Sequence, residues 1–390
     1  MPKFTVRFLH TADWHLGRIF HQTHLTEEQG HVLNQIVEIA RAEKVDAVLV
    51  AGDLYDRAVP PPEAVALLDK TWQRLVLDLG VPVVAMPGNH DSATRIGYGA
   101  ALLARAGLHL VADFETATRP VAVGNVDVFA LPFTEPNEVR AWSGNTEVRD
   151  HSSAMQACID GMRPHFTPGR PRVLVAHAFV AGERKESESE RPLSVGGAGT
   201  VSADLFTDFD YVALGHLHAP QVVSGRCVYS GSPLKYSFSE AGDVKSVVIV
   251  DISDSGAVSS RLIPLKAGRD VRNLEGALAE LIAAAPKDPN REDYLRITLT
   301  DDGALLNALG RLREVYPNVL QLERRFLQGT SMTSIGEASA RRRESTEADL
   351  FAGFFREVVG DAPNAQEAAL FQEALGHLQR IETETTEATA

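Results

Sequence analysis

Short apolar runs alternate with an amphipathic segment along the first hundred residues. Thr26–Glu43 carries apolar residues at helical spacing, and Thr26 with Gln29 fits a capping box at its start. A second helix is expected to begin at Pro60–Pro62, because proline is tolerated in a first turn. Three segments are short, apolar and rich in β-branched residues, as buried strands are: Phe4–Leu9, Val45–Ala51 and Val81–Met86.

The pattern changes after Arg119, where strand-like runs follow one another with fewer helices between them. A mixed sheet, or a pair of packed sheets with outer helices, fits this order best, and the fold class is α/β. The expected strands are Val126–Leu131, Val173–His177, Tyr211–Leu214, Val222–Val223 and Val244–Ile252.

The remainder of the chain divides into smaller parts. Residues 274–327 predict a small α/β unit, read as helix, strand, helix and strand, with the last three at Tyr294–Leu299, Ala304–Tyr316 and Val319–Arg325. Residues 328–343 are polar and small, which is typical of a linker. The predicted domains are therefore 1–273 for the main domain, 274–327 for a cap, 328–343 for the linker and 344–390 for a helical tail.

The tail carries apolar side chains at helical spacing. Thr346 and Asp349 fit a capping box, and Gly360 separates two stripes. The tail either folds onto the main domain or grips a partner protein, and we favour the second. The first stripe is Leu350, Phe351, Phe354, Phe355 and Val358, and the second is Leu370, Phe371, Ala374, Leu375 and Leu378.

Charge and cysteine content narrow the function classes. The 390 residues carry a formal net charge of −14, which argues against broad electrostatic binding of nucleic acid. Ten acidic residues and two arginines lie in 344–390, so direct DNA binding by the tail is disfavoured. Two cysteines, Cys158 and Cys227, and the lack of an apolar leader or span fit a cytoplasmic protein.

Polar residues follow five of the expected strands at the point where each strand ends. Glycines 52, 88 and 215 precede three of these groups and allow close backbone approach. Ligands that converge from strand ends form a binding site, and this mixture of imidazole, carboxylate and amide suits manganese, iron or zinc better than magnesium. The groups are Asp13 and His15; Asp53 and Asp56; Asn89, His90 and Asp91; His177; and His216 with His218.

The series D-x-H, GDLYD, GNHD, H and GHLH resembles the calcineurin-like metallophosphoesterase superfamily. The segments HTADWHLG, GHLHAPQ and YSGSPLKYSFSE resemble the branch of nuclease subunits that act with SbcC-type ATPases in bacterial double-strand-break repair. The resemblance implies two packed mixed β-sheets flanked by helices, and two divalent ions, with Mn²⁺ as the expected metal. It assigns Asp13, His15, Asp53 and His218 to one ion, and Asp53, Asn89, His177 and His216 to the other.

The same resemblance implies the reaction and the partners. His90 would contact the scissile phosphate or assist the leaving group, and Asp91 would orient His90. The expected activities are 3′-to-5′ exonuclease on double-stranded DNA and endonuclease on hairpins, by a homodimer within a heterotetramer. Asp56 stands where archaeal relatives have histidine, so it is left out of the catalytic set.

Three alternatives remain open on the sequence alone. The same metal centre would serve a phosphatase or a nucleotide phosphodiesterase, because the motifs define phosphoester hydrolysis better than its substrate. A non-catalytic assembly subunit is the alternative of another class, although no ligand is missing. Residues 183–190 are expected to form a solvated loop, with substrate gating as the second interpretation.

Overall fold

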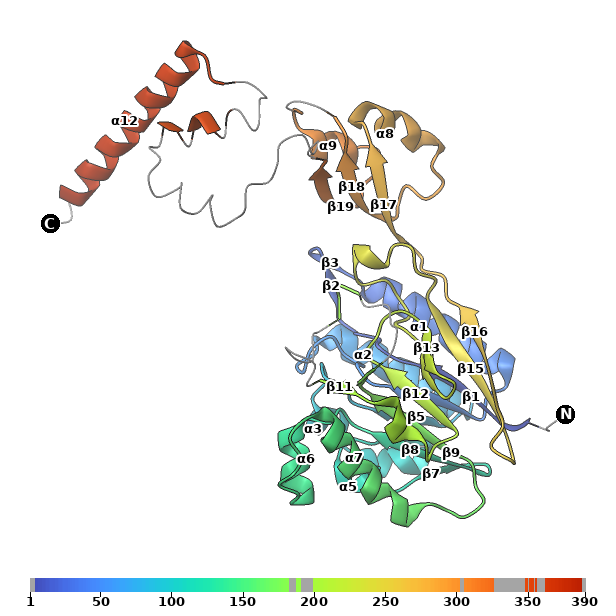
Figure 1. Cartoon of the computed structure of the whole chain (residues 1–390). Coiled ribbons are helices and arrows are strands. Elements are labelled where there is room, and N and C mark those ends of the chain that lie inside the picture. The colour runs from blue at the N-terminus through green and yellow to red at the C-terminus, as the bar shows by residue number, and fades with distance from the viewer. Residues whose placement is uncertain are drawn as a thin grey trace. The chain divides into compact units, whose positions relative to one another are not determined.

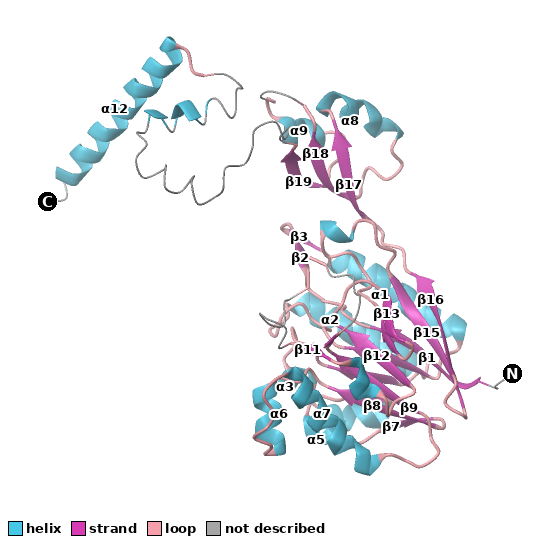
Figure 2. Cartoon of the chain, viewed as in Figure 1, coloured by secondary structure: helices cyan, strands magenta, loops and turns pink. Residues whose placement is uncertain are grey.

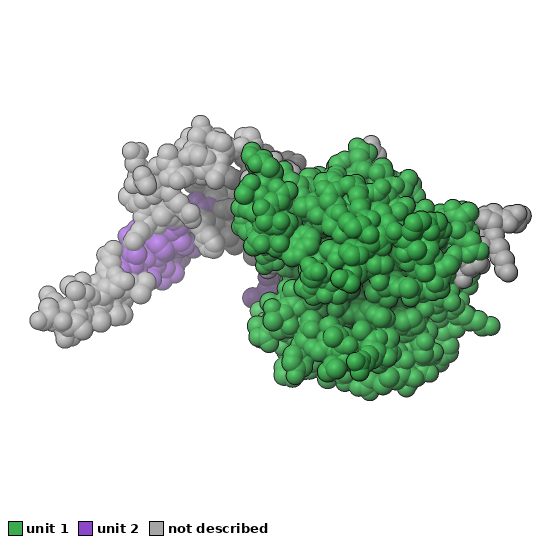
Figure 3. Space-filling model, turned by 90° about the horizontal axis from the view of Figure 1, so that it is seen from below, with its two compact units in different colours: residues 1–272 green, residues 273–390 purple. Residues whose placement is uncertain are grey.

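The computed structural model describes residues 4–181, 187–190, 199–301, 305–325, 348–349, 351–353, 355 and 362–387. The chain forms two compact units, residues 1–272 and 273–390 (Figure 3). Within the described part of the chain, no helix combines the length and the apolar content needed to cross a membrane.

The first unit contains two six-stranded mixed sheets (Figure 1). In the first sheet, β1, β4, β5 and β6 are parallel, and β15 and β16 extend it as antiparallel strands. All three strands expected in the first hundred residues are present. In sheet order the strands are β16 (Val258–Pro264), β15 (Ser246–Ser253), β1 (Phe4–Thr11), β4 (Ala47–Ala51), β5 (Val83–Met86) and β6 (Leu108–Leu110).

The second sheet also has four parallel strands, but its two antiparallel strands lie at opposite edges. Its strands β8, β9, β12 and β14 are parallel, and β7 and β13 flank them as antiparallel edges. In sheet order the strands are β13 (Gln221–Ser224), β14 (Cys227–Tyr229), β12 (Tyr211–Gly215), β9 (Arg172–His177), β8 (Val126–Leu131) and β7 (Val121–Val123). Two short ladders accompany the sheets: β2 (Ile19–Phe20) with β3 (Thr23–His24), and β10 (Phe179–Val180) with β11 (Thr200–Val201).

Alternation along the strands builds two hydrophobic layers. Phe8 and Leu49 belong to a core shared with residues of the second sheet such as Val175, so the two sheets pack face to face. Leu9 points to the other face of its sheet and packs in a second core with Ile36 of α1. Helices therefore cover the outer faces, as Figure 2 shows, and the predicted architecture of two packed mixed sheets is confirmed.

The helices of the first unit begin near the expected residues. α1 spans Thr26–Glu43, but Leu25 is its N-cap and no side chain caps it, so the predicted capping box of Thr26 and Gln29 is wrong. α2 begins at Pro62, within the proline-rich start that was expected. The helices are α1, α2 (Pro62–Trp72, continued by a π-helical stretch at Gln73–Asp78), α3 (Ala93–Ile96), α4 (Ala100–Leu103), α5 (Phe114–Ala117), α6 (Pro136–Ser143) and α7 (His151–Met162).

The second unit contains a three-stranded sheet in the order β17, β18, β19, with β18 and β19 parallel. Its core includes Leu295, Ile297 and Leu312. The strand β17 was not expected, because a helix was predicted from residue 274 onward. The elements are β17 (Val271–Gly276), α8 (Leu278–Ala284), β18 (Tyr294–Leu299), α9 (Ala308–Arg313) and β19 (Val319–Arg324).

The tail is described in part. α12 spans Ala365–Glu387, and the rings of Phe351 and Phe371 stack with centroids 4.1 Å apart, so the two predicted stripes contact each other there. The linker 328–343 lies outside the described residues. So do Thr346, Leu350, Phe354, Val358 and Gly360 of the predicted tail pattern.

Candidate metal centre

The predicted ligands meet at one edge of the two sheets. Parallel strands of both sheets end there, and each ligand lies at or just beyond a strand end. Asp13 follows β1, Asp53 follows β4, Asn89 follows β5, His177 ends β9, and His216 and His218 follow β12. All of these side chains are buried except that of Asn89, which is half-buried.

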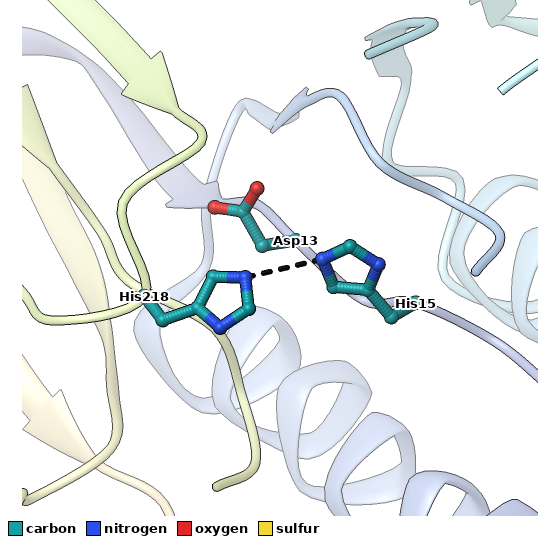
Figure 4. Close-up of side chains that lie close together, drawn as sticks. All are labelled: Asp13, His15 and His218. Carbon is teal, nitrogen blue, oxygen red and sulfur yellow. Dashed lines mark hydrogen bonds between the residues drawn. The ribbon is translucent and has the colours of Figure 1, made fainter. Parts of the chain in front are cut away.

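Asp13, His15 and His218 form the first group of potential ligands (Figure 4). The Nε2 atoms of His15 and His218 lie 3.2 Å apart. Among the side chains that the structure describes, the Nδ1 atom of His15 is buried without a hydrogen-bond partner, and the Asp56 carboxylate lies 3.7 Å from it. Two ring nitrogens that face each other at this distance are suited to bind one cation together.

Asp13, Asp53 and His177 form the second group. His177 Nε2 lies 2.8 Å from the side-chain oxygen of Asn89 and 3.5 Å from Asp53 Oδ2. The same Asp53 oxygen lies 3.6 Å from His15 Nε2 in the first group. Asp53 Oδ2 therefore stands between the two groups, where a carboxylate would bridge two ions.

Hydrogen bonds orient His177. Its Nδ1 atom lies 3.0 Å from the Ala51 carbonyl oxygen, which only accepts, so Nδ1 carries the proton. The neutral ring then turns the lone pair of Nε2 toward the Asn89 side-chain oxygen and Asp53 Oδ2, which also only accept, and a cation would relieve this convergence of lone pairs. This is the tautomer that a metal ligand requires.

The backbone of the ligands is strained. Among the described residues, eight non-glycine residues have positive φ, and four of these are Asp13 (55°), His15 (44°), Asp53 (49°) and His216 (108°). Such a conformation costs about 1–3 kcal/mol for each residue and persists where the surroundings impose it. Here the Asp13 amide donates to the Gly52 carbonyl, the His15 amide donates to the Asp53 carbonyl, and the His216 amide donates to the Asp13 carboxylate.

Glycine is required at two positions behind the ligands. Gly52 has φ of 85°, and a Cβ atom there would lie 2.5 Å from His177 Nδ1 and 2.9 Å from the Gly88 Cα. A Cβ atom on Gly88 would overlap the Asp53 carboxylate. The loops after β4 and β5 therefore approach closely only because both residues lack a side chain.

Burial sets the protonation states of the site. It lowers the pKa of His15, with His218 adding to the effect, and it is the main cause of the lowered pKa of His177 and His218. Burial and the Asp53 carboxylate raise the pKa of Asp13 well above its usual value. Neutral imidazoles beside crowded carboxylates form a site that a divalent cation would stabilise.

His90 and Asp91 lie beside the ligands but do not pair as expected. The His90 amide donates to Asp53 Oδ1 at 2.9 Å, and its ring Nδ1 lies 2.9 Å from the Asp56 carbonyl oxygen. The Asp91 carboxylate instead accepts the backbone amides of Leu54, Tyr55 and Gly88. The Asp56 carbonyl therefore orients the His90 ring, and Asp91 fastens the two ligand loops together.

Several residues of the site were not predicted. Gln29 accepts the Gly17 amide and donates to the His15 carbonyl oxygen at 2.7 Å, which braces the first ligand loop. The hydroxyl of Tyr236 donates to the Trp14 carbonyl at 2.5 Å. The Glu240 carboxylate lies 3.4 Å from His218 Nδ1. Burial alone would raise the pKa of Glu240, but the charge of Lys245 and the hydrogen bond to His218 outweigh burial and hold this pKa below its usual range. The segment YSGSPLKYSFSE contains both Tyr236 and Glu240, and its resemblance to the nuclease branch was the sequence feature that could have pointed to these two residues.

Comparisons with known proteins show the family of the chain. A model of the calcineurin-like phosphoesterases matches residues 6–220, and a model described as the type 5 capsule protein repressor C-terminal domain matches residues 267–359. The chain is 32% identical over 357 residues to the D subunit of nuclease SbcCD from Staphylococcus saprophyticus, covering 91% of this chain and 94% of that one. It is 33% identical over 318 residues to the protein of the same name in Staphylococcus epidermidis, covering 81% and 85%. The solved structure of TT1561 of Thermus thermophilus is similar with a TM-score of 0.40 at 14% identity, covering 66% of this chain and 99% of that one.

The fold and the site define a metallophosphoesterase, and the chain belongs to the calcineurin-like phosphoesterase family. Over nine-tenths of its length it is similar to the D subunit of nuclease SbcCD. The predicted family and enzyme class are thereby confirmed.

Proposed function

We propose that this chain is a DNA nuclease of the SbcD type that hydrolyses phosphodiester bonds with two divalent ions. The observation that carries the proposal is the position of Asp53 Oδ2, within 3.6 Å of His15 Nε2 and 3.5 Å of His177 Nε2. A carboxylate between two imidazole groups is suited to bridge two ions. The similarity of the chain to nuclease subunits of SbcCD supports DNA as the substrate.

The two ions would share Asp53, and Asp13, which lies in both groups of potential ligands, is assigned to the first ion only. Manganese suits the mixture of imidazole, carboxylate and amide donors. A pair of such ions, when bound, stabilises the attacking and leaving oxygens of an in-line displacement. The proposed ligands are Asp13, His15, Asp53 and His218 for one ion, and Asp53, Asn89, His177 and His216 for the other.

His90 is proposed to act on the substrate and not to hold an ion. Its backbone amide is fixed by Asp53 and its Nδ1 by the Asp56 carbonyl, so Nδ1 carries the proton. The Nε2 atom is then left to contact the scissile phosphate or to transfer a proton to the leaving group. Asp91 supports this arrangement by holding the loops after β4 and β5.

The finer activity and the partners are part of the same proposal. We propose 3′-to-5′ exonuclease activity on double-stranded ends and endonuclease activity on hairpins, in DNA repair and recombination in the cytoplasm. The chain would act as a homodimer in a heterotetramer with an SbcC-type ATPase. Residues 1–273 would form the nuclease domain, 274–327 a cap that orients DNA, 328–343 a linker, and 344–390 the ATPase-binding tail.

The Asp53→Ala variant tests the metal centre. Losing a bridging ligand affects both groups, so bound Mn²⁺ and hydrolysis of hairpin and double-stranded DNA should fall together. Bound manganese is measured by metal analysis after gel filtration, beside cleavage rates. A variant that retains two ions and normal cleavage contradicts the proposal, and a wild-type enzyme that hydrolyses only p-nitrophenyl phosphate or dinucleotides indicates a phosphatase or phosphodiesterase instead.

A further inference from the structure

The segment Ser187–Glu190 lies against the metal ligand His218. The Ser189 hydroxyl is 2.7 Å from His218 Nδ1, and the Glu190 carboxylate accepts the His218 amide at 2.7 Å. This segment belongs to the stretch that was expected to be a solvated loop, and its described part is instead attached to the site. It therefore contributes to how His218 is held.

Behind the serine hydroxyls lies one buried carboxylate. Oε1 of Glu240 is 2.5 Å from the Ser189 hydroxyl and 2.6 Å from the Ser187 hydroxyl, and it is 3.4 Å from His218 Nδ1. Glu240 is 1% exposed, and its other oxygen lies 2.6 Å from the ammonium group of Lys245. The carboxylate is thus charged, paired and enclosed.

The donors and acceptors of the hydrogen bonds among His218, Ser189 and Glu240 follow from the carboxylate. A carboxylate only accepts hydrogen bonds, so Ser189 donates its one proton to Glu240 over a short, charge-assisted bond. The Ser189 oxygen is then left to accept a hydrogen bond, and the neighbouring donor is Nδ1 of His218. The proton of His218 is consequently on Nδ1, and Nε2 presents its lone pair toward His15 Nε2, 3.2 Å away.

We propose that Glu240 is a positioning residue that fixes the metal-binding tautomer of His218 through the hydroxyl of Ser189. The inference rests on the proposed metal function and assigns a role to residues outside the ligand set. Carboxylates behind ligating histidines fix the tautomer and the ring orientation, and losing one typically weakens metal binding about 10–100-fold. His177 obtains the same fixation from the Ala51 carbonyl, so the site expected to weaken without Glu240 is the one that contains His218.

Lys245 completes the arrangement. Its ammonium group donates to the His218 carbonyl oxygen at 2.8 Å and to the Ser232 hydroxyl at 3.0 Å, besides Glu240. It therefore neutralises the buried carboxylate and holds the backbone of the ligand at the same time. A variant that removes only the charge of Glu240 leaves Lys245 buried without its counterion, which is destabilising.

Glu240→Gln is the main test, because glutamine keeps the shape but adds a donor. The glutamine amide is able to donate a hydrogen bond to the Ser189 oxygen. The Ser189 hydroxyl would then donate to His218 Nδ1, which allows the His218 proton to move to Nε2. Mn²⁺ binding to metal-free protein is followed by the electron paramagnetic resonance signal of free Mn²⁺. One of two binding events should weaken about 10–100-fold, and the other should stay within about threefold.

A spectroscopic measurement separates tautomer control from stability. In metal-free protein labelled with ¹⁵N-histidine, the His218 signals are assigned by their loss in His218→Gln. Wild-type His218 should be protonated on Nδ1 alone, and Glu240→Gln should show protonation on Nε2. The double variant Glu240→Gln with Lys245→Met removes both charges and should give the same change even if the single variant unfolds.

Asp270→Asn is the matched control. Asp270 pairs with Lys235 at 2.9 Å in the same region, and this pair is not among the contacts of His218. The control should bind two ions as wild type does. Unchanged affinity for both ions in the Glu240 variants, or an Nε2 proton on wild-type His218, overturns the inference. A wild-type protein that binds fewer than two ions overturns the proposed function instead.

Discussion

The buried side chain of His10 leads to a prediction about how strongly the free energy of unfolding depends on pH. It lies in β1, three residues before Asp13, and its side chain is fully buried. Its Nδ1 atom is 3.0 Å from the Tyr211 hydroxyl, and its Nε2 atom is 3.2 Å from the Leu214 carbonyl oxygen. The carbonyl accepts from Nε2, so the neutral ring satisfies both partners, whereas a charged ring would have to donate to both.

Burial lowers the pKa of His10 from 6.5 to about 3, although the bond to Leu214 opposes it. Between these two values the unfolded chain binds a proton that the folded chain rejects, so the contribution of His10 to stability is complete above pH 6.5 and is lost as the pH falls toward 3. At about 1.4 kcal/mol for each pH unit, the total is about 5 kcal/mol. Between pH 7.5 and pH 4.5 the loss is about 3 kcal/mol.

His10→Gln removes the titration while keeping one donor and one acceptor. The variant should therefore lose about 3 kcal/mol less free energy of unfolding than wild type when the pH is lowered from 7.5 to 4.5. Urea unfolding of metal-free protein, followed by tryptophan fluorescence, measures this difference. All three tryptophans, Trp14, Trp72 and Trp142, lie in the first unit, so the signal reports that unit.

The control is His31→Gln, because His31 is exposed on α1. Its free energy of unfolding, measured at both pH values, is the reference for replacing an exposed histidine by glutamine. Equal pH dependence of wild type and His10→Gln, within about 0.5 kcal/mol, would refute the reasoning, because burial would then not exclude the charged ring.

Three further predictions concern the reaction and its partners. His90→Ala should retain both ions and slow DNA cleavage about 10²–10⁴-fold; a rate within about threefold of wild type removes His90 from the mechanism. Deleting residues 274–327 should alter the choice among DNA ends more than the hydrolysis of a small phosphodiester; equal losses on both substrates point to a role in folding. Deleting residues 344–390 should abolish co-purification with an SbcC-type ATPase while the isolated subunit keeps its manganese-dependent activity; a complex of unchanged affinity shows that the tail is not the main attachment point.

The strands that the sequence predicted well are those with continuous burial. β4 and β5 are buried at every position, and apolar runs identify such strands directly. β16 was missed because most of its side chains are exposed, and β17 because its pattern is mixed. The hydrophobic pattern of a sequence indicates which side chains are buried. It does not indicate these two strands, because they are held in their sheets by backbone hydrogen bonds to a neighbouring strand.

The capping box of α1 failed for a related reason. Thr26 and Gln29 have the spacing that local rules require, but the Gln29 side chain bonds to the backbone of residues 14, 15 and 17. A long-range contact with a strained loop has replaced the local one. Glu240 escaped prediction similarly, because its partners His218, Ser189 and Lys245 come together only in the folded chain.

The backbone conformation of the ligands bears on why the sequence motifs pointed to the metal site, whereas the residues that hold the ligands by hydrogen bonds were not predicted. Asp13, His15, Asp53 and His216 are held at positive φ, where every residue with a Cβ atom is less favourable than glycine. Such a backbone costs about 1–3 kcal/mol for each residue and persists because hydrogen bonds between the ligand loops impose it. The supports are ordinary polar residues in relaxed conformations, so the sequence does not distinguish them from surface residues. Chemistry at strand ends is visible in the sequence because it opposes local preference, whereas the hydrogen bonds that maintain it follow that preference and become visible only in the structure.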